Sequence, residues 1–122
     1  MANKEPDANL TGNLTLTGQL LGKPLLIQRS RLTGFRHHGA PSLWPTLRAR
    51  AALVLSAESD NPYDPYAVAV FWNRHKLGYL PRGENLVAAR LLARSRPLSA
   101  RIRRLRPRAE CNRRLELDVL MH

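Results

Sequence analysis

The sequence predicts a mainly β fold: a small, partly open barrel of the OB-like or SH3-like kind, with about six strands and one helix. Three observations carry this prediction. Residues 67–72 form an apolar run that follows a turn with two prolines, and residues 98–103 and 115–121 alternate apolar with polar side chains. A third is that only residues 85–94 show a convincing helical pattern. At 122 residues the chain is long enough for one domain with a modest core.

The N-terminal segment differs in composition from the rest of the chain. Residues 1–22 are rich in Asn, Thr, Gly and Leu, and we interpret them as a flexible tail that could add one short strand near residues 14–17. The folded domain is therefore expected to span residues 23–122.

The first half of the domain contains two strand candidates. Residues 25–34 form the first, and residues 47–55 the second, with its buried end at 53–55. Prolines interrupt the connection between them, and Leu43 and Trp44 in that connection are expected to fold back onto the barrel.

A proline-rich turn precedes the apolar run. Pro62 and Pro65 fix their φ angles, and Asn61 and Asp64 can bond their own backbone, so local chemistry holds the turn. Residues 67–72 are then expected to be a strand buried on both faces. Residues 73–76 form a polar connection, after which 77–80 return as the partner strand until Pro81 ends it.

The helix predicted over residues 85–94 has Asn85 at its N-cap position. Its apolar face would close an open end of the barrel, and it comprises Leu86, Ala89, Leu92 and Ala93.

The last two strands are expected to pair. The alternation in residues 98–103 slips after Arg103, which predicts a β-bulge or the end of the strand. Leu115 to Met121 alternates cleanly, with Glu116 and Asp118 on the outward side. Pairing would place those carboxylates beside Arg101 and Arg103.

The charge of the chain points to nucleic acid. Twenty basic residues, seventeen of them Arg, face nine acidic ones, which gives a net charge of +11. The guanidinium fork suits phosphate, although a coding bias towards Arg with a merely solvated surface is the alternative. The chain has a single cysteine, Cys111, so it cannot form an intramolecular disulfide. It has no apolar run long enough to span a membrane, and its N-terminus is too polar for a secretory signal. We therefore expect a cytoplasmic protein without membrane contact.

Catalytic and metal-binding classes find little support. The chain has no phosphate-binding Gly-rich loop, and its His and Cys residues lack the spacing of a zinc site. The prediction is a protein that is not an enzyme and needs no metal or cofactor.

Two motifs together carry a family resemblance. Asp60-Asn-Pro-Tyr-Asp-Pro-Tyr-Ala-Val-Ala-Val-Phe-Trp72 followed by Leu77-Gly-Tyr-Leu-Pro-Arg82 resembles the signature of the HIRAN domain, and the resemblance covers roughly residues 28–122. That domain occurs at the N-terminus of some chromatin-remodelling-type helicases and alone in small bacterial proteins. The resemblance implies a small barrel that holds the 3′ end of single-stranded DNA, in repair or replication, beside a separate helicase or other repair enzyme.

The resemblance also implies roles for six residues. Arg36 would contact phosphate, while His37 and His38, which replace the family's two tyrosines, would flank terminal bases. Asp64 would accept a hydrogen bond from the free 3′-hydroxyl, and Tyr63 and Tyr79 would flank bases.

Each role has a structural alternative. Asp64 could only cap its turn, and Tyr63 and Tyr79 could be partly buried packing residues. At the level of the whole protein, the alternative is a protein-interaction adaptor that recruits a separate helicase or nuclease, and RNA could replace DNA as the ligand.

Overall fold

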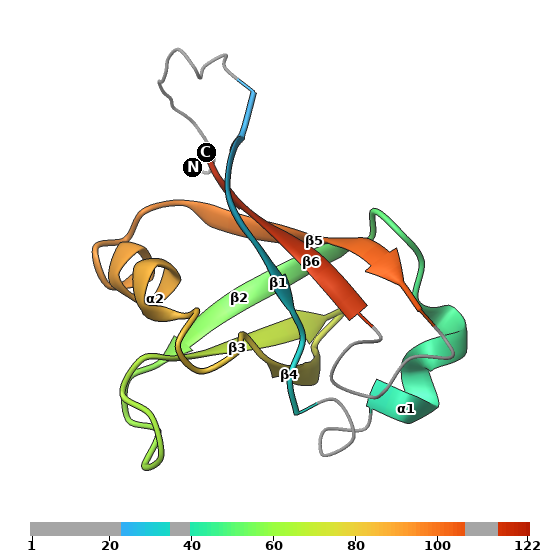
Figure 1. The fold of residues 1–122 in the computed structure, drawn as a ribbon, viewed down its shortest axis with the longest axis horizontal. Coiled ribbons are helices and arrows are strands. Elements are labelled where there is room, and N and C mark those ends of the chain that lie inside the picture. Colours follow the sequence, from blue (N-terminus) through green and yellow to red (C-terminus); the bar gives the residue numbers. More distant parts are fainter. Residues whose placement is uncertain (1–22, 35–39, 107–114) are drawn as a thin grey trace.

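The computed structural model describes residues 23–34, 40–106 and 115–122 (Figure 1). They form a mainly β structure, an antiparallel six-stranded sheet that is not closed, with one helix of about two turns, as the sequence predicted. The elements in chain order are β1 Leu25–Arg31, α1 Ala40–Leu43, the 3-10 turn η2 Trp44–Thr46, β2 Ala52–Glu58, β3 Ala67–Trp72, β4 His75–Tyr79, α2 Leu86–Ala93, β5 Leu98–Leu105 and β6 Leu115–Met121. The predicted tail at 1–22 lies outside the described residues.

The sheet curls until its two edges almost meet. Its strand order is β1-β6-β5-β2-β3-β4, with every neighbouring pair antiparallel. Just beyond β1, Thr33 exchanges two backbone hydrogen bonds with Tyr79 of β4, at 2.9 and 2.8 Å. A Cβ on Gly78 would collide with the Thr33 carbonyl oxygen, so this close approach requires glycine. The result is a partly open barrel.

The core fills the inside of this curled sheet. The first four residues of β3 are all buried, which confirms a strand covered on both faces. Helix α2 packs against β2, β3 and β5 at one end of the molecule, and α1 lies at the other end against β4 (Figure 1). The fully buried large side chains are Leu32, Leu47, Leu77, Leu80, Ile102, Leu115, Leu117, Val68, Val70 and Val119.

Helix α2 turns to the core a face that matches the predicted one only in part. Ala89 and Leu92 face the core as predicted, whereas Leu86 and Ala93 are exposed. Ala88 is buried as well. The small alanines let the helix backbone approach the sheet closely, so the largest apolar side chain of the first turn is not the one that packs.

The second strand begins later than predicted. Leu47 is buried, but β2 starts only at Ala52, because Arg50 adopts a left-handed backbone conformation with φ 72° that a strand cannot contain. Within β2 only Leu53 and Leu55 are buried; Val54 points outward, as strict strand alternation requires.

The connection between β3 and β4 is shorter than predicted. Only Asn73 and Arg74 form the turn, with φ values of 46° and 73°. Two consecutive positive φ angles are typical of the type I′ turn, whose twist matches a tight hairpin. His75 and Lys76 therefore belong to β4.

The predicted pairing of the last two strands is confirmed. The register shifts between Ile102 and Arg104, which is the expected bulge, and Asp118 and Glu116 form ion pairs with Arg101 and Arg103.

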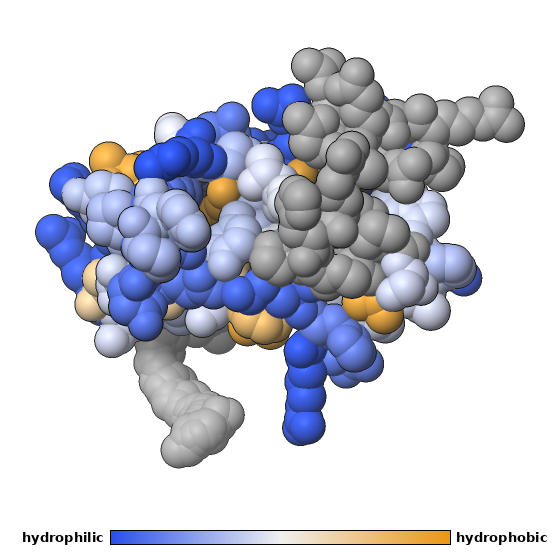
Figure 2. Space-filling model, turned by 90° about the horizontal axis from the view of Figure 1, so that it is seen from below, coloured by the Kyte–Doolittle hydropathy of each residue, from blue (hydrophilic) through white to orange (hydrophobic). Residues whose placement is uncertain are grey.

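The surface is mostly hydrophilic: Figure 2 shows only small, scattered hydrophobic areas on one face. No helix in the described part of the chain has the length and apolar character to cross a membrane.

Candidate functional site

The turn between β2 and β3 is held by its own side chains. Asn61 Oδ1 accepts hydrogen bonds from the backbone N–H groups of Tyr63 and Asp64, at 2.8 and 3.2 Å. Asp64 Oδ1 accepts another from the N–H of Tyr66, at 2.9 Å. These Asx-type bonds and the two prolines fix the turn before any tertiary contact is made, as the sequence predicted.

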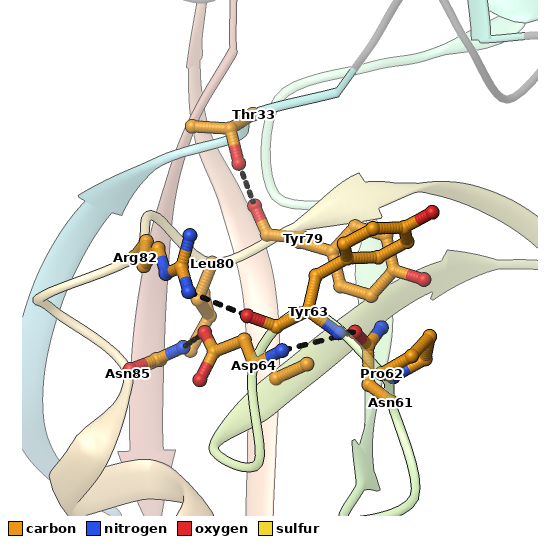
Figure 3. A pocket seen from close by; sticks show the side chains of 10 residues that line it. Thr33, Asn61, Pro62, Tyr63, Asp64, Tyr79, Leu80, Arg82 and Asn85 are labelled. Carbon is orange, nitrogen blue, oxygen red and sulfur yellow. Dashed lines mark hydrogen bonds between the residues drawn. The ribbon is translucent and has the colours of Figure 1, made fainter.

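Two residues that follow β4 anchor the turn to the rest of the domain. Asn85 Nδ2 donates a hydrogen bond to Asp64 Oδ2 at 2.8 Å, and Arg82 Nη2 donates one to the Tyr63 carbonyl oxygen (Figure 3). Asn85 occupies the N-cap position of α2, but its side chain makes no capping bond. The predicted cap is thus used to hold Asp64 instead.

These contacts keep Asp64 ionised. Hydrogen bonds from the N–H of Tyr66 and the amide of Asn85 hold the pKa of Asp64 below its usual value of 3.8; desolvation opposes them in part, and the nearby charge of Arg82 adds a smaller lowering effect. Among the described residues each carboxylate oxygen has one hydrogen-bond donor, and an ionised carboxylate has about four acceptor positions. Asp64 therefore retains capacity to accept a further hydrogen bond.

A second set of polar contacts fixes Tyr79. The Tyr79 hydroxyl donates to Glu58 Oε1 at 2.9 Å, and Lys76 Nζ donates to Glu58 Oε2 at 2.8 Å while lying 5.1 Å from the centre of the Tyr79 ring. Glu58 also accepts a hydrogen bond from Asn61 Nδ2 at 3.1 Å. The hydrogen bond from Lys76 holds the pKa of Glu58 below its usual value, and the same contact raises the pKa of Lys76. This cluster ties the base of the turn to β4.

Between the turn and β4 lies an open pocket of about 470 Å³. Its most exposed aromatic side chain is Tyr63, 81% of which is accessible. The pocket combines aromatic surface, a cation and a fixed carboxylate, and it is lined by Thr33, Asn61, Pro62, Tyr63, Asp64, Ala67, Tyr79, Leu80, Arg82 and Asn85 (Figure 3). Such a pocket suits a ligand with a flat ring and a hydroxyl group.

The structure brings together three of the six residues singled out in the sequence. Tyr63, Asp64 and Tyr79 line the same pocket. The packing alternative is wrong for Tyr63, which is exposed, whereas Tyr79 is half-buried and bonded within the Glu58 cluster. Asp64 does hold its turn.

The other three, Arg36, His37 and His38, lie outside the described residues. Thr33, just before that segment, is in the pocket wall.

Sequence reasoning gave no site role to three other pocket residues. Arg82 stands at the end of the second motif, so its place in that motif was a usable signal. Asn85 was read only as a helix cap, and Thr33 only as part of a strand. Nothing in the sequence pattern brings them to the turn, because the contacts cross from one hairpin to another. Among the described residues, no three His, Cys, Asp or Glu side chains gather in a way that could hold a metal ion.

One family model matches this chain, and two solved structures are similar to it. The profile of the HIRAN domain matches residues 27–120. A crystal structure of a protein from Lactobacillus plantarum is similar at 28% identity and a TM-score of 0.72, covering 81% of this chain and 95% of that one. The crystal structure of the HIRAN domain of human HLTF is similar at 17% identity and a TM-score of 0.60, covering 82% and 79%. No curated protein gives a significant match.

Proposed function

This chain belongs to the HIRAN domain family, a family of non-catalytic DNA-binding modules, and from that premise we propose that its pocket binds the 3′-hydroxyl end of single-stranded DNA. The module would act in DNA repair or replication, positioning a strand end for a separate enzyme.

The observation that carries the proposal is the state of Asp64. Its carboxylate is ionised, fixed by Tyr66 and Asn85, and still able to accept a hydrogen bond in the pocket wall. A terminal 3′-hydroxyl can donate that bond, whereas an internal nucleotide has no free hydroxyl at this position. A terminal phosphate would be repelled by the same carboxylate, which adds discrimination.

The surrounding residues suit the rest of a terminal nucleotide. The exposed ring of Tyr63 offers a surface on which a base can stack whatever its identity. Arg82 uses one Nη group to hold the turn, so its guanidinium sits at the pocket edge where a phosphate would follow the terminal sugar. By the family resemblance Arg36, His37 and His38 would extend this contact to the phosphate and base of the strand end.

The test compares two fluorescent single strands that differ only in ending with a 3′-hydroxyl or a 3′-phosphate. Fluorescence anisotropy at about physiological ionic strength damps nonspecific attraction to the +11 chain. We expect the hydroxyl strand to bind about tenfold more tightly, the effect of one charge-assisted hydrogen bond of ~1.4 kcal/mol. The log–log slope of affinity against salt should be about −2 to −3 for three or four phosphates.

Asp64→Asn should abolish this preference, since the amide keeps the shape of the side chain but loses its charge. The matched control is Asp60→Asn, which makes the same charge change at an exposed residue outside the pocket. Equal binding of both strands by the wild-type protein would refute end recognition, and would favour the alternative of an adaptor that binds protein. Strands that differ only in the 2′-hydroxyl would decide between DNA and RNA.

A further inference from the structure

Arginines gather on a second surface, the outer face of β1, β6 and β5. The strand register places Arg29 and Arg101 on either side of Asp118, which lies on the central strand β6. Glu116 lies two positions before Asp118 on β6, and Arg31 of β1 lies opposite it. We call this surface the arginine face, and its cations are Arg29, Arg31, Arg50, Arg101, Arg103 and Arg106.

Asp118 holds two of these arginines in a particular way. Its side chain is only 5% exposed, and it contacts the Nε atoms of Arg29 and Arg101 at 3.1 and 3.5 Å. Because both contacts use Nε, the terminal Nη groups of the two arginines have no partner among the described residues. Those side chains are 57% and 52% exposed. The carboxylate therefore orients two guanidinium groups without occupying the ends that would bind a ligand.

The second carboxylate of the arginine face pairs with two further arginines. Glu116 pairs with Arg103 Nη1 at 3.0 Å and with Arg106 Nη2 at 2.9 Å. Arg31, on the opposite side of Glu116, makes no ion pair within the described parts of the chain. Four of the six arginines thus pair with two carboxylates, and a third carboxylate, that of Glu84, lies near Arg29 and Arg31. Six cations beside three carboxylates leave the face with an excess of positive charge.

Arg50 completes a hollow on this face. Its backbone N–H bonds to the Ile102 carbonyl oxygen at 2.7 Å, which places it beside Arg101 and Arg103 around an open hollow of about 410 Å³. The backbone of Arg50 has φ 72°, a left-handed conformation that glycine adopts readily and most other residues disfavour. Three arginines around one hollow, with Asp118 as its acidic lining residue, form a cationic site suited to an anion.

The chemistry of the face selects the kind of anion. No aromatic side chain lines the hollow within the described residues, so bases have no ring on which to stack. In a duplex the bases are already stacked inside and only phosphates meet the protein, which guanidinium forks fit well. We propose that the arginine face binds the phosphate backbone of double-stranded DNA, as a second site that shares no residue with the pocket.

The probe is a covalently closed DNA dumbbell, a duplex of about two helical turns that has no free 3′ end and so cannot use the pocket. The variant is Arg50→Gly, which removes one charge from the arginine face and also relieves the positive φ. Its matched control is Arg74→Gly, the same substitution at φ 73° in the β3–β4 turn. Glycine favours both conformations, so neither change is expected to impair folding.

Binding is measured as a function of salt for the wild type and both variants. Relative to Arg74→Gly, we expect Arg50→Gly to bind the dumbbell about threefold more weakly or worse, with a log–log salt slope smaller in magnitude by about one. Arg29→Gln combined with Arg101→Gln should deepen the loss. If the two glycine variants bind the dumbbell equally, or if the wild type does not bind it, the proposal is overturned. Because the dumbbell has no strand end, neither result bears on end recognition by the pocket.

Discussion

Glu58 is expected to be a main support of the pocket, and Glu58→Gln is the change that measures its contribution. The carboxylate accepts three hydrogen bonds, from Lys76, Tyr79 and Asn61, at 2.8, 2.9 and 3.1 Å. The Glu58 and Lys76 side chains are 24% and 29% exposed, so water screens their pairing only in part. Glutamine keeps one acceptor oxygen but turns the other end of the side chain into a donor, which would face a donor from Lys76.

The magnitude follows from the character of the lost contact. An exposed ion pair contributes ~0–1 kcal/mol, and a hydrogen bond to a charged group about 1.5–3 kcal/mol. For a pair that is about three-quarters buried, we expect Glu58→Gln to lower the free energy of unfolding by about 1.5 kcal/mol and the melting temperature by about 6–10 °C. Urea and thermal denaturation measure both quantities. Glu84→Gln, at an exposed residue with one long contact to Ser30, is the control and should change stability by less than ~0.5 kcal/mol.

The pH dependence separates this explanation from a general loss of packing. The pKa of Glu58 is lowered in the folded protein, so its stabilising effect is present above the unfolded value near 4.5 and is lost as the pH falls through the folded pKa. The difference between wild type and Glu58→Gln should therefore be full at neutral pH and shrink in acid. A difference below ~0.5 kcal/mol at neutral pH, or one that does not change with pH, would refute the reasoning.

Two further predictions concern the contacts that bring the pocket together. Gly78→Ala should lower the free energy of unfolding by about 2–4 kcal/mol, because the added Cβ would collide with Thr33. Gly83→Ala should lower it by only about 1 kcal/mol, since no atom lies near the added Cβ and only the positive φ of 90° disfavours alanine. Equal urea midpoints for the two variants would contradict this prediction. Asn85→Asp should lower stability by about 1–2 kcal/mol at neutral pH, although Asp is a good N-cap residue, because it sets a second carboxylate against Asp64. Repulsion between the two carboxylates would raise their pKa values, so the loss of stability should diminish as the pH falls. A variant as stable as the wild type at neutral pH would show that the hydrogen bond from Asn85 to Asp64 is unimportant.

Some of this protein could be predicted from the sequence because the signals are local. Alternation over Leu115–Met121 comes directly from strand geometry, and the Asx bonds of the turn join residues two or three positions apart. The apolar run of β3 predicted burial on both faces correctly. The combination of the two motifs was enough to indicate the family, which the profile match over residues 27–120 confirmed.

Other features depended on backbone states that composition does not encode. The start of β2 was predicted too early because nothing in the sequence indicates that Arg50 adopts a left-handed conformation. Helical spacing placed Ala89 and Leu92 on the buried face of α2 correctly, but it did not indicate that Ala88 is buried while Leu86 and Ala93 are exposed.

Three features follow from the amino-acid sequence alone: the β class of the fold, the rigid turn and the excess of arginine. Only the tertiary structure decided which distant residues meet: Asn85 and Arg82 hold Asp64 and Tyr63, and Thr33 reaches Tyr79 across the open side of the sheet. It also decided which arginines are paired and how, since Asp118 contacts two of them through Nε and leaves their outer groups available. These hydrogen bonds join the β2–β3 turn to the segment after β4, and the end of β1 to β4. They depend on sheet order and curvature, which arise from packing the whole core and not from any local pattern.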